Sequence, residues 1–458
     1  MLLLLLSPLI MSDNESSGPG WYGWYVSALF CALYTLSFVD RLIVGLLIEP
    51  IKADLNLSDT QISLVHGFSF AVFYTVFGLV MGRLADTVNR RNLIAFGVFT
   101  WSLLTMLCGI AKHFLHLLGF RVGVGIGEAA LTPAAYSIIT DYFPPEKRST
   151  ALSLFSAGVY FGIAGAFTGG AYIYRAIDAW LTERGGLMLP LLGEMQTWQL
   201  VFMAVGAPGL IMGAMVLTIR EPKRQTAHAE VENASEAPSL PVVLSYFKKN
   251  WRTVLGHNMG IALITAAAYS RDLWNTPFFE RTYGWQLYES GIWYGLVVLI
   301  AGVSGVMVGG RVGDWLKKRN NDSANMHVML FASLGWLPFG LCYPLMPTAA
   351  LSLTLLFPAI FMTSLPFGCA AAAVQEMMPP RMRGTGSALM LSANGIIGLG
   401  FGPTVVALVT DYVFADESAL RYSLVIVCGS IQVVGALFIF SALKPFRATL
   451  ERLKEPKS

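Results

Sequence analysis

The stretch Gly82–Arg91, GRLADTVNRR, recurs later in the chain as Gly310–Arg319, GRVGDWLKKR, and the two align without a gap. In each copy a long apolar segment runs into Gly-Arg-x-small-Asp, and two basic residues follow shortly after the Asp. A second pair, Pro144–Thr150 (PPEKRST) and Pro379–Thr385 (PPRMRGT), stands at nearly the same separation. Basic turns between apolar helices would explain the charges, but not the shared Gly, Asp and double Pro. The sequence therefore predicts a duplicated chain in which each motif marks a helix end, a tight turn and a new helix start.

The composition is that of a membrane protein. The chain has 458 residues, of which 55% are hydrophobic and 13% charged, with a mean hydropathy of +0.59. A soluble protein has about 25% charged residues. Crossing a bilayer takes about 20 apolar residues per helix, and twelve such runs are present, whereas strands of a membrane barrel would be shorter and would alternate in polarity. We therefore expect an all-α membrane protein with twelve transmembrane helices in two pseudo-symmetric six-helix bundles.

The expected helices form two sets of six around a solvated linker that is rich in Glu, Ala, Ser, Pro and Lys. The first set spans about 24–48, 59–83, 92–111, 115–141, 149–173 and 198–219, and the second about 252–276, 288–312, 326–346, 350–377, 384–411 and 421–443. Residues 174–197 are expected to form a longer loop. The expected domains are an N-terminal segment 1–22, a bundle 23–220, a linker 221–246, a bundle 247–444 and a tail 445–458.

The distribution of Lys and Arg predicts the orientation. The breaks after the even-numbered helices and the C-terminal tail hold 22 of the 31 Lys and Arg residues, and the opposite loops hold few. By the positive-inside rule both termini are cytoplasmic, and we expect a bacterial inner (plasma) membrane protein. The first eleven residues, MLLLLLSPLIM, lack the basic region and cleavage site of a signal peptide, so we treat them as a frayed or misassigned start with Met11 as a second candidate initiator.

Several function classes find no support. All five cysteines fall in apolar runs without Cys-x-x-Cys spacing, so neither disulfides nor a zinc site is indicated. Basic residues gather in short loops and do not interleave with aromatic residues, so nucleic-acid binding is not expected. No nucleophile or metal-ligand constellation is visible, so we expect no enzyme activity, no metal and no cofactor, and we expect a monomer.

The arrangement of helices and motifs resembles the major facilitator superfamily over residues 23–444. The similarity consists of twelve helices in two related halves, a basic linker and GRLADTVNRR after the second helix. Within the superfamily, Phe38–Arg41 (FVDR) and Arg121–Ala129 (RVGVGIGEA) resemble the Spinster branch. That branch is associated with proton-coupled export of sphingolipids and lysophospholipids.

The resemblance implies a cytoplasmic charge relay that holds the halves together when the cavity faces outward. Matching positions place this cytoplasmic gate at Asp86, Arg90 and Arg91 and, in the second copy, at Asp314, Lys318 and Arg319. Asn89 stands where the family usually has Gly, and Asn tolerates the left-handed conformation that a turn would need there. The antiporters of the family have a Gly-Pro motif in the fifth helix, where this chain has Gly165-Ala166, which weakens an antiport interpretation.

Four ionisable residues in the middle of expected helices stand out: Asp40, Arg41, Arg121 and Glu128. A charge at the bilayer centre costs ~2.5–3.5 kcal/mol on insertion scales, so such residues are functional candidates. Counting along the helices puts Asp40 and Arg121 at one depth and Glu128 roughly two turns deeper. We therefore expect an Asp40–Arg121 contact, and we interpret the group as a proton-coupling switch. A permanent structural ion pair is the alternative.

The resemblance also implies that helices 1, 4, 7 and 10 line the substrate cavity. Those helices carry the cavity candidates Phe38, Tyr136, Tyr269 and Phe367. His66 is interpreted as a core histidine with its hydrogen bonds satisfied, with a place in the proton route as the alternative. The pair Arg271-Asp272 either gates the cavity or lies at the membrane interface.

Together these features favour a proton-coupled secondary transporter that exports an amphipathic lipid-like substrate by alternating access. The few charges on the expected cavity helices agree with this substrate class, but the choice of lipid comes from the resemblance. The alternative is proton-coupled uptake of a small organic anion such as a sugar acid, with Arg41 or Arg121 gripping its carboxylate. A transport-dead sensor or scaffold would not need intact charge relays in both halves.

Overall fold

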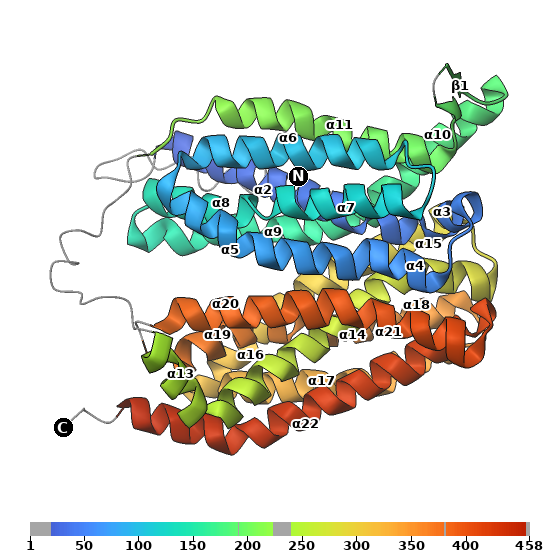
Figure 1. Ribbon diagram of the computed structural model, residues 1–458. Coiled ribbons are helices and arrows are strands. Elements are labelled where there is room, and N and C mark those ends of the chain that lie inside the picture. Colours follow the sequence, from blue (N-terminus) through green and yellow to red (C-terminus); the bar gives the residue numbers. More distant parts are fainter. Residues whose placement is uncertain (1–19, 191, 223–239, 380–381, 455–458) are drawn as a thin grey trace.

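The structure is a computed structural model that describes residues 20–190, 192–222, 240–379 and 382–454. Its helices form two bundles, one before and one after the segment that joins them (Figure 1). The first eleven residues and most of the expected linker lie outside the described residues.

The first bundle contains a two-stranded hairpin besides its helices. Its elements are α2 (Trp21–Leu46), α3 (Ile48–Leu55), α4 (Asp59–Ser63), η1 (Leu64–Phe68), α5 (Ser69–Thr87), α6 (Arg90–Cys108), α7 (Phe114–Glu128), α8 (Leu131–Tyr142), α9 (Pro145–Ala164), η2 (Gly165–Gly169), α10 (Gly170–Arg184), β1 (Met188–Leu189), β2 (Gly193–Glu194) and α11 (Thr197–Leu217).

Among its described residues, the regular elements of the second bundle are all helices. Its elements are α13 (Leu240–Lys249), α14 (Trp251–Tyr283), α15 (Leu287–Val297), η3 (Val298–Gly302), α16 (Val303–Lys318), α17 (Ala324–Cys342), η4 (Tyr343–Leu345), α18 (Ala349–Ser364), α19 (Pro366–Met377), α20 (Arg383–Ala393), η6 (Asn394–Phe401), α21 (Gly402–Leu408), η7 (Val409–Phe414), η8 (Glu417–Ala419) and α22 (Leu420–Lys454).

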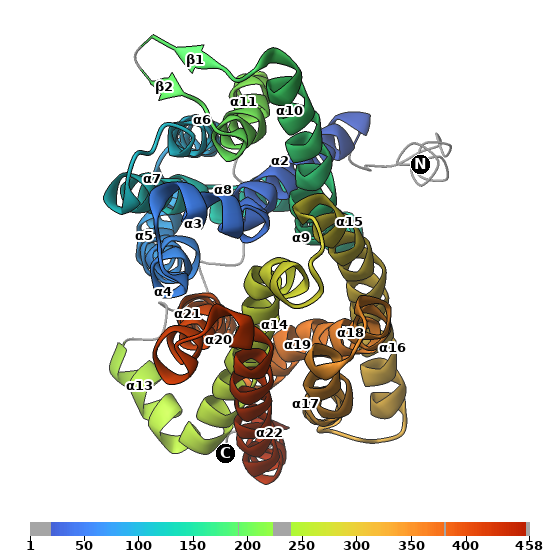
Figure 2. The same cartoon turned by 90° about the vertical axis from the view of Figure 1, so that its right-hand side faces the viewer.

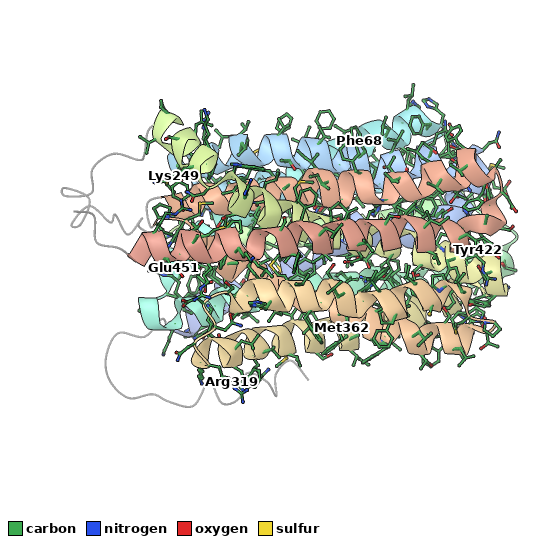
Figure 3. All side chains as sticks on the ribbon, turned by 90° about the horizontal axis from the view of Figure 1, so that it is seen from below. Phe68, Lys249, Arg319, Met362, Tyr422 and Glu451 are labelled. Carbon is green, nitrogen blue, oxygen red and sulfur yellow. The ribbon has the colours of Figure 1, made fainter. Side chains whose placement is uncertain are left out.

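The helices of the two bundles run along one common direction, so the molecule has two ends (Figure 1). The C-terminal ends of α11 and α22 and the whole of α13 lie at one end, which we call the linker end (Figure 1). The opposite end, where α3, α4 and α21 lie, is called the far end. Figure 3 shows Lys249, Arg319 and Glu451 at the linker end and Tyr422 at the far end.

The expected all-α membrane fold is confirmed. Eleven helical segments of the described residues are long and apolar enough to cross a membrane. The twelfth expected helix corresponds to α14, whose 33 residues include His257, Asn258, Arg271 and Asp272 and are therefore less apolar. At ~1.5 Å per residue α14 is still longer than the ~30 Å apolar core of a bilayer.

The loop expected at residues 174–197 is mostly wrong. The helix continues through η2 and α10 to Arg184, because the segment YRAIDAWLTER contains no helix breaker. It ends at Gly185, which adopts the left-handed conformation with φ of 70° that caps many helices. The antiparallel strands β1 and β2 then form a short hairpin before α11.

Two expected boundaries also differ from the structure. The linker was expected to reach Tyr246, but α13 already begins at Leu240, and its last turn carries Lys248 and Lys249. The tail was expected from residue 445, but α22 continues as helix to Lys454 with Pro445 inside it. Both differences arise because short amphipathic helices lack the long apolar run from which transmembrane spans are recognised.

The motif that predicts the duplication forms its turn differently in the two halves. In the first half α5 ends at Thr87, and Asn89 caps α6 by accepting a hydrogen bond of 2.9 Å from the Asn92 backbone. The φ of Asn89 is −68°, so the left-handed conformation expected for it is wrong. In the second half α16 continues to Lys318, and the left-handed residue is Asn320, with φ of 59°. The predicted helix end, turn and new helix start are thus confirmed for the first copy. In the second copy the helix continues through the motif, and the turn comes after it.

The two bundles pack closely through small residues. A Cβ atom at Gly291 of α15 would lie 2.6 Å from the Leu46 side chain and 3.0 Å from the Cβ of Ala171 on α10. A Cβ at Gly67 of η1 would lie 2.5 Å from the backbone oxygen of Leu399 in η6. The view from the far end shows α10 next to α15 along this boundary (Figure 2).

Candidate functional site

The four intramembrane ionisable residues come together as one buried cluster, which we call the N-half cluster: Asp40 and Arg41 on α2, and Arg121 and Glu128 on α7. Their exposed fractions do not exceed 5%. The two helices run in opposite directions along the bundle (Figure 1). Arg121 meets the backbone of α2 at Asp40 and Arg41, and Glu128, two turns further along α7, meets the Arg41 side chain. Bringing four ionisable groups out of water is costly unless they are paired and hydrogen-bonded.

The ion pair of the cluster is formed by Arg41 and Glu128. The Nη2 atom of Arg41 lies 2.7 Å from Oε2 of Glu128, and the Ser37 hydroxyl donates a second hydrogen bond of 2.7 Å to the same oxygen. The guanidinium of Arg41 also lies 4.6 Å from the ring centres of Phe38 and Phe70. Aromatic faces stabilise a desolvated cation, so Arg41 keeps its charge beside apolar neighbours.

Arg121 binds backbone and not the Asp40 carboxylate. Its Nη1 donates to the Asp40 carbonyl oxygen at 2.8 Å, and its Nη2 donates to the Arg41 carbonyl oxygen at 3.0 Å. The predicted contact between residues 40 and 121 is therefore present, but in this conformation it is made through backbone oxygens and not through the carboxylate. The guanidinium group spans two successive carbonyls of α2.

The Asp40 carboxyl group is the unusual member of the cluster. Both of its oxygens are buried, and no salt bridge of the described residues reaches them. The indole NH of Trp101 and the hydroxyl of Thr105 on α6 are the neutral donors that interact with the carboxyl group. Asp40 is therefore held in a dry site without a bound cation, while Glu128 has one.

His66 differs from its interpretation as a satisfied core histidine. It is fully buried in η1, but neither ring nitrogen has a hydrogen-bond partner among the described residues. Arg41 and Arg121 are the charged groups that act on it. The satisfied-histidine interpretation is wrong.

A cavity of about 390 Å³ lies between the two bundles. Three of the four cavity candidates line it: Phe38 from α2, Tyr269 from α14 and Phe367 from α19. The fourth, Tyr136, is not among the lining residues and packs edge-on against Phe155 with ring centres 5.3 Å apart. The remaining lining comes from α9, α14, η3, α16, α18 and α19 and mixes aliphatic side chains with the hydroxyls of Ser156, Thr265, Thr363 and Ser364.

Arg271 and Asp272 form the charged part of the cavity wall. Nη2 of Arg271 lies 2.9 Å from Oδ1 of Asp272, and the same oxygen accepts a hydrogen bond of 2.5 Å from the Tyr294 hydroxyl. Arg271 also donates to the Thr363 hydroxyl at 2.9 Å. The structure thus assigns this pair to the cavity and not to the membrane interface.

The gate candidates at the linker end do not bridge the bundles in this structure. Arg90 pairs with Asp141 at 2.5 Å and with Glu221 at 2.7 Å, all within the first half. The Arg91 backbone NH donates to Glu221 at 2.9 Å. Asp86 is exposed and has no ion pair within the described chain.

The second-half gate candidates likewise stay within their own bundle. The guanidinium of Arg319 lies 3.9 Å from the ring centre of Trp315, while Asp314 and Lys318 are exposed. The ion pair of this region joins Lys317 with Glu376 on α19. Lys317 was not among the predicted gate residues.

A second network of charges, which we call the far-end network, joins the two bundles. Arg281 of α14 donates to both carboxylate oxygens of Asp59 at 2.6 and 2.8 Å and lies 2.7 Å from Glu49. Lys52 contacts Asp59 and lies 2.8 Å from Glu417. Glu49, Lys52 and Asp59 belong to the first half, whereas Arg281 and Glu417 belong to the second. The sequence analysis did not single out this network, because its pairing depends on how the halves meet.

Further polar contacts join the halves near the far end. Besides the far-end network, Thr60 donates twice to Asp411, at 2.6 and 2.8 Å, and Thr168 donates to the Ile292 carbonyl oxygen at 3.2 Å. No salt bridge among the described residues crosses between the bundles at the linker end. The bundles are therefore tied at the far end.

Metal chemistry is not indicated by the described part of the chain. It contains no group of three or more His, Cys, Asp or Glu residues that could hold a metal ion. Its five cysteines are free, and four of them are buried.

Comparison with known proteins identifies the family. The profile described as Major Facilitator Superfamily matches residues 29–403. The chain belongs to the major facilitator superfamily. An MFS-type efflux pump of Mycolicibacterium smegmatis is 30% identical over 444 residues, which cover 93% of each protein. A probable L-galactonate transporter of Escherichia coli is 25% identical over 430 residues, which cover 90% of this chain and 87% of that protein.

A solved structure supports the more specific resemblance. It is the crystal structure of a bacterial homolog to the human lysosomal transporter Spinster, in an inward-facing and unoccupied conformation. It matches with a TM-score of 0.78 and 26% identity over 97% of this chain and 100% of that chain. The resemblance of this superfamily member to Spinster proteins is thereby confirmed.

We predict that Arg281→Gln loosens the far end of this transporter. Removing one partner of a buried ion pair costs ~3–5 kcal/mol, because carboxylates are left buried without a cation. Since ~1.4 kcal/mol changes a population ratio tenfold, distances between spin labels at the far ends of α3 and α15 should lengthen or become bimodal. Arg184→Gln is the matched control, since Arg184 is exposed in the first half and lies over Trp180. Unchanged distances in Arg281→Gln would show that the far-end network does not hold the halves.

Proposed function

We propose that this superfamily member is a proton-coupled secondary transporter that exports an amphipathic, lipid-like molecule of the lysophospholipid or sphingolipid type by alternating access. The observation that carries the proposal is the cavity between the bundles, which combines a mainly aliphatic and aromatic lining with the charged pair Arg271 and Asp272 and a few Ser, Thr and Tyr hydroxyls. A molecule with a charged headgroup and a single apolar chain matches such a surface. The similarity to an efflux pump supports export, and the lipid substrate is what the resemblance to the Spinster branch implies.

We further propose that the linker end faces the cytoplasm, with both termini on that side of a bacterial inner membrane. The surplus of Lys and Arg in the loops of this end supports the orientation. The far-end network then closes the outer side, and the structure corresponds to an inward-facing state. In the outward-facing state, Asp86 and the basic residues near it are expected to tie the linker ends together.

The proton step is proposed to use both carboxyl groups of the N-half cluster. In this conformation Glu128 is held by Arg41 and Ser37. Asp40 is the proposed proton carrier, because its buried carboxyl group forms no salt bridge within the described residues and an ionised carboxylate without a cation in a dry site would cost several kcal/mol. When the far end opens and admits water, Asp40 releases its proton, and Arg121 is the nearby cation that then stabilises its charge.

Uptake of a small organic anion is the second candidate function. It is favoured by the similarity to the probable L-galactonate transporter. Arg41 and Arg121, the residues expected to grip a carboxylate, are already engaged by Glu128 and by backbone carbonyls, and neither lines the cavity. Arg271 would have to serve as the anion site in their place.

The first prediction concerns the cytoplasmic gate. Asp86→Asn removes the anion of the proposed relay, so the outward-facing state should lose stability and the population should shift toward the inward-facing state. Spin-label distances across the linker end measure the shift. Asp314→Asn should shift the population less, because α16 continues through its copy of the motif. A distribution unchanged by Asp86→Asn would argue against the relay in this chain.

The second prediction concerns the substrate class. Affinity for single-chain lipids should rise with acyl length by roughly 0.8 kcal/mol per buried methylene until the cavity is full. Sugar acids should not compete. The measurement is competitive binding to the purified transporter, followed by flux into vesicles with and without a pH gradient. Affinity that is independent of chain length, or strong competition by galactonate, would favour the second candidate function.

The third prediction concerns the proton switch. Asp40→Asn resembles the protonated acid and should give one conformational preference from about pH 5 to pH 8, abolish gradient-driven flux and leave substrate affinity within about tenfold. Glu128→Gln should also impair flux, but should keep part of the pH response because Asp40 remains. Spin-label distances at several pH values, measured beside flux, report both effects. Retention of the full pH response and flux by Asp40→Asn would leave the cluster as a structural ion pair.

A further inference from the structure

A second cavity, of about 580 Å³, lies on the outside of the second bundle at the linker end. It is formed by the first turns of α14 and by the part of α22 around Pro445. Its lining includes Trp251, Arg252 and Leu255 from α14 and Phe438, Ser441 and Lys444 from α22. None of these residues lines the cavity between the bundles, so the two cavities are separate.

The lining changes from charged to apolar along the helices. Arg252 and Lys444 stand where the apolar spans of α14 and α22 end toward the linker end. Leu255 lies ~4.5 Å deeper along α14 than Arg252, and Phe438 lies ~9 Å deeper along α22 than Lys444. Trp251 beside them is 54% exposed, and an exposed Trp is common at the membrane–water interface.

The two cations of this cavity have no acidic partner among the described residues. Neither Arg252 nor Lys444 takes part in a salt bridge of the described chain, although the nearby Arg447 pairs with Glu451 at 3.1 Å. The guanidinium of Arg252 lies 5.4 Å from the ring centre of Trp251. Within the described residues, neither positive charge of this cavity is neutralised by an ion pair, so both can bind an external anion.

At the bottom of the cavity, α14 and α22 cross in close contact. A Cβ atom at Gly256 would lie 2.5 Å from the Cβ of Ala442 and 2.8 Å from the Phe438 carbonyl oxygen. Next to this contact, the side chains of α14 and α22 leave a groove between them. The groove follows the two helices toward the membrane centre. The short helix α13 lies at the same end, with Val242 and Leu244 more than half exposed and Lys248 and Lys249 in its last turn. Apolar exposure next to basic residues is typical of helices that lie in the membrane interface.

We propose that this groove, which we call the α14–α22 groove, binds an anionic phospholipid from the leaflet at the linker end. The lipid phosphate lies between Arg252 and Lys444, and an acyl chain follows Leu255 and Phe438 toward the membrane centre. Two cations without an acid favour a headgroup with net negative charge over a zwitterionic one. The apolar part of the groove favours a membrane lipid over a free phosphate. The assignment does not depend on what the central cavity transports.

The test compares lipids on the full-length protein purified in detergent. Phosphatidylglycerol and phosphatidylcholine with the same acyl chains are titrated, and bound lipid is counted by native mass spectrometry while the unfolding temperature is recorded. We expect wild-type protein to bind phosphatidylglycerol at least tenfold more tightly than phosphatidylcholine. Arg252→Gln combined with Lys444→Gln should remove this preference.

The matched control is Lys147→Gln combined with Arg220→Gln, which removes two exposed cations from the linker end of the first half. This control should keep the preference. Ser441→Glu is a second variant of the groove, which leaves both cations in place but adds a negative charge, and it should also abolish the preference. The proposal is overturned if the groove variants keep the wild-type preference, as they would if the lipid bound in the central cavity. It is equally overturned if the control loses as much as the groove variants, since general surface charge would then explain the binding.

Discussion

The contact of Arg281 with Asp59 and Glu49 is the constraint on which the rest of this conformation depends. It is a two-pronged, largely buried ion pair between α14 of one half and the α3–α4 region of the other. Lys52 and Glu417 extend it, so that each half contributes both signs of charge. A buried ion pair adds little net stability when water can solvate the separated charges. Removing one partner while the other stays buried is costly. The far end is therefore a two-state element, and opening requires the carboxylates to become wet as the cation leaves.

In the N-half cluster, which lies deeper in the protein, buried charges again need partners. Its two arginines are satisfied by different acceptors, because Arg41 binds Glu128 and Arg121 binds backbone carbonyls. One carboxyl group is therefore left without a cation, and Asp40 is that group. In the proposed proton step, this unmatched acid is the group that exchanges partners. An element that must exchange partners during a cycle needs such an unmatched group.

Much of the fold could be predicted from the sequence, and less of the site. The repeated GRLADTVNRR motif and the apolar run lengths determine helix number and the two halves, because both depend on local pattern. Depth counting along α2 and α7 correctly brought residues 40 and 121 together. It could not tell a carboxylate from a carbonyl as the acceptor, since that choice depends on helix rotation. The far-end network could not be predicted from the sequence either, because Arg281 meets Asp59 only after the halves have packed.

The position of Phe38 connects the cavity with the charged cluster. Its ring lines the cavity, and the Arg41 guanidinium lies 4.6 Å from the centre of that ring. Ser37, the neighbouring residue, donates to the same Glu128 oxygen that Arg41 binds. One turn of α2 therefore faces the cavity on one side and holds the ion pair on the other. We infer that a molecule in contact with Phe38 changes how well Arg41 reaches Glu128. Cavity occupancy and carboxyl protonation are then coupled through a single turn of α2, without a relay across the bundle.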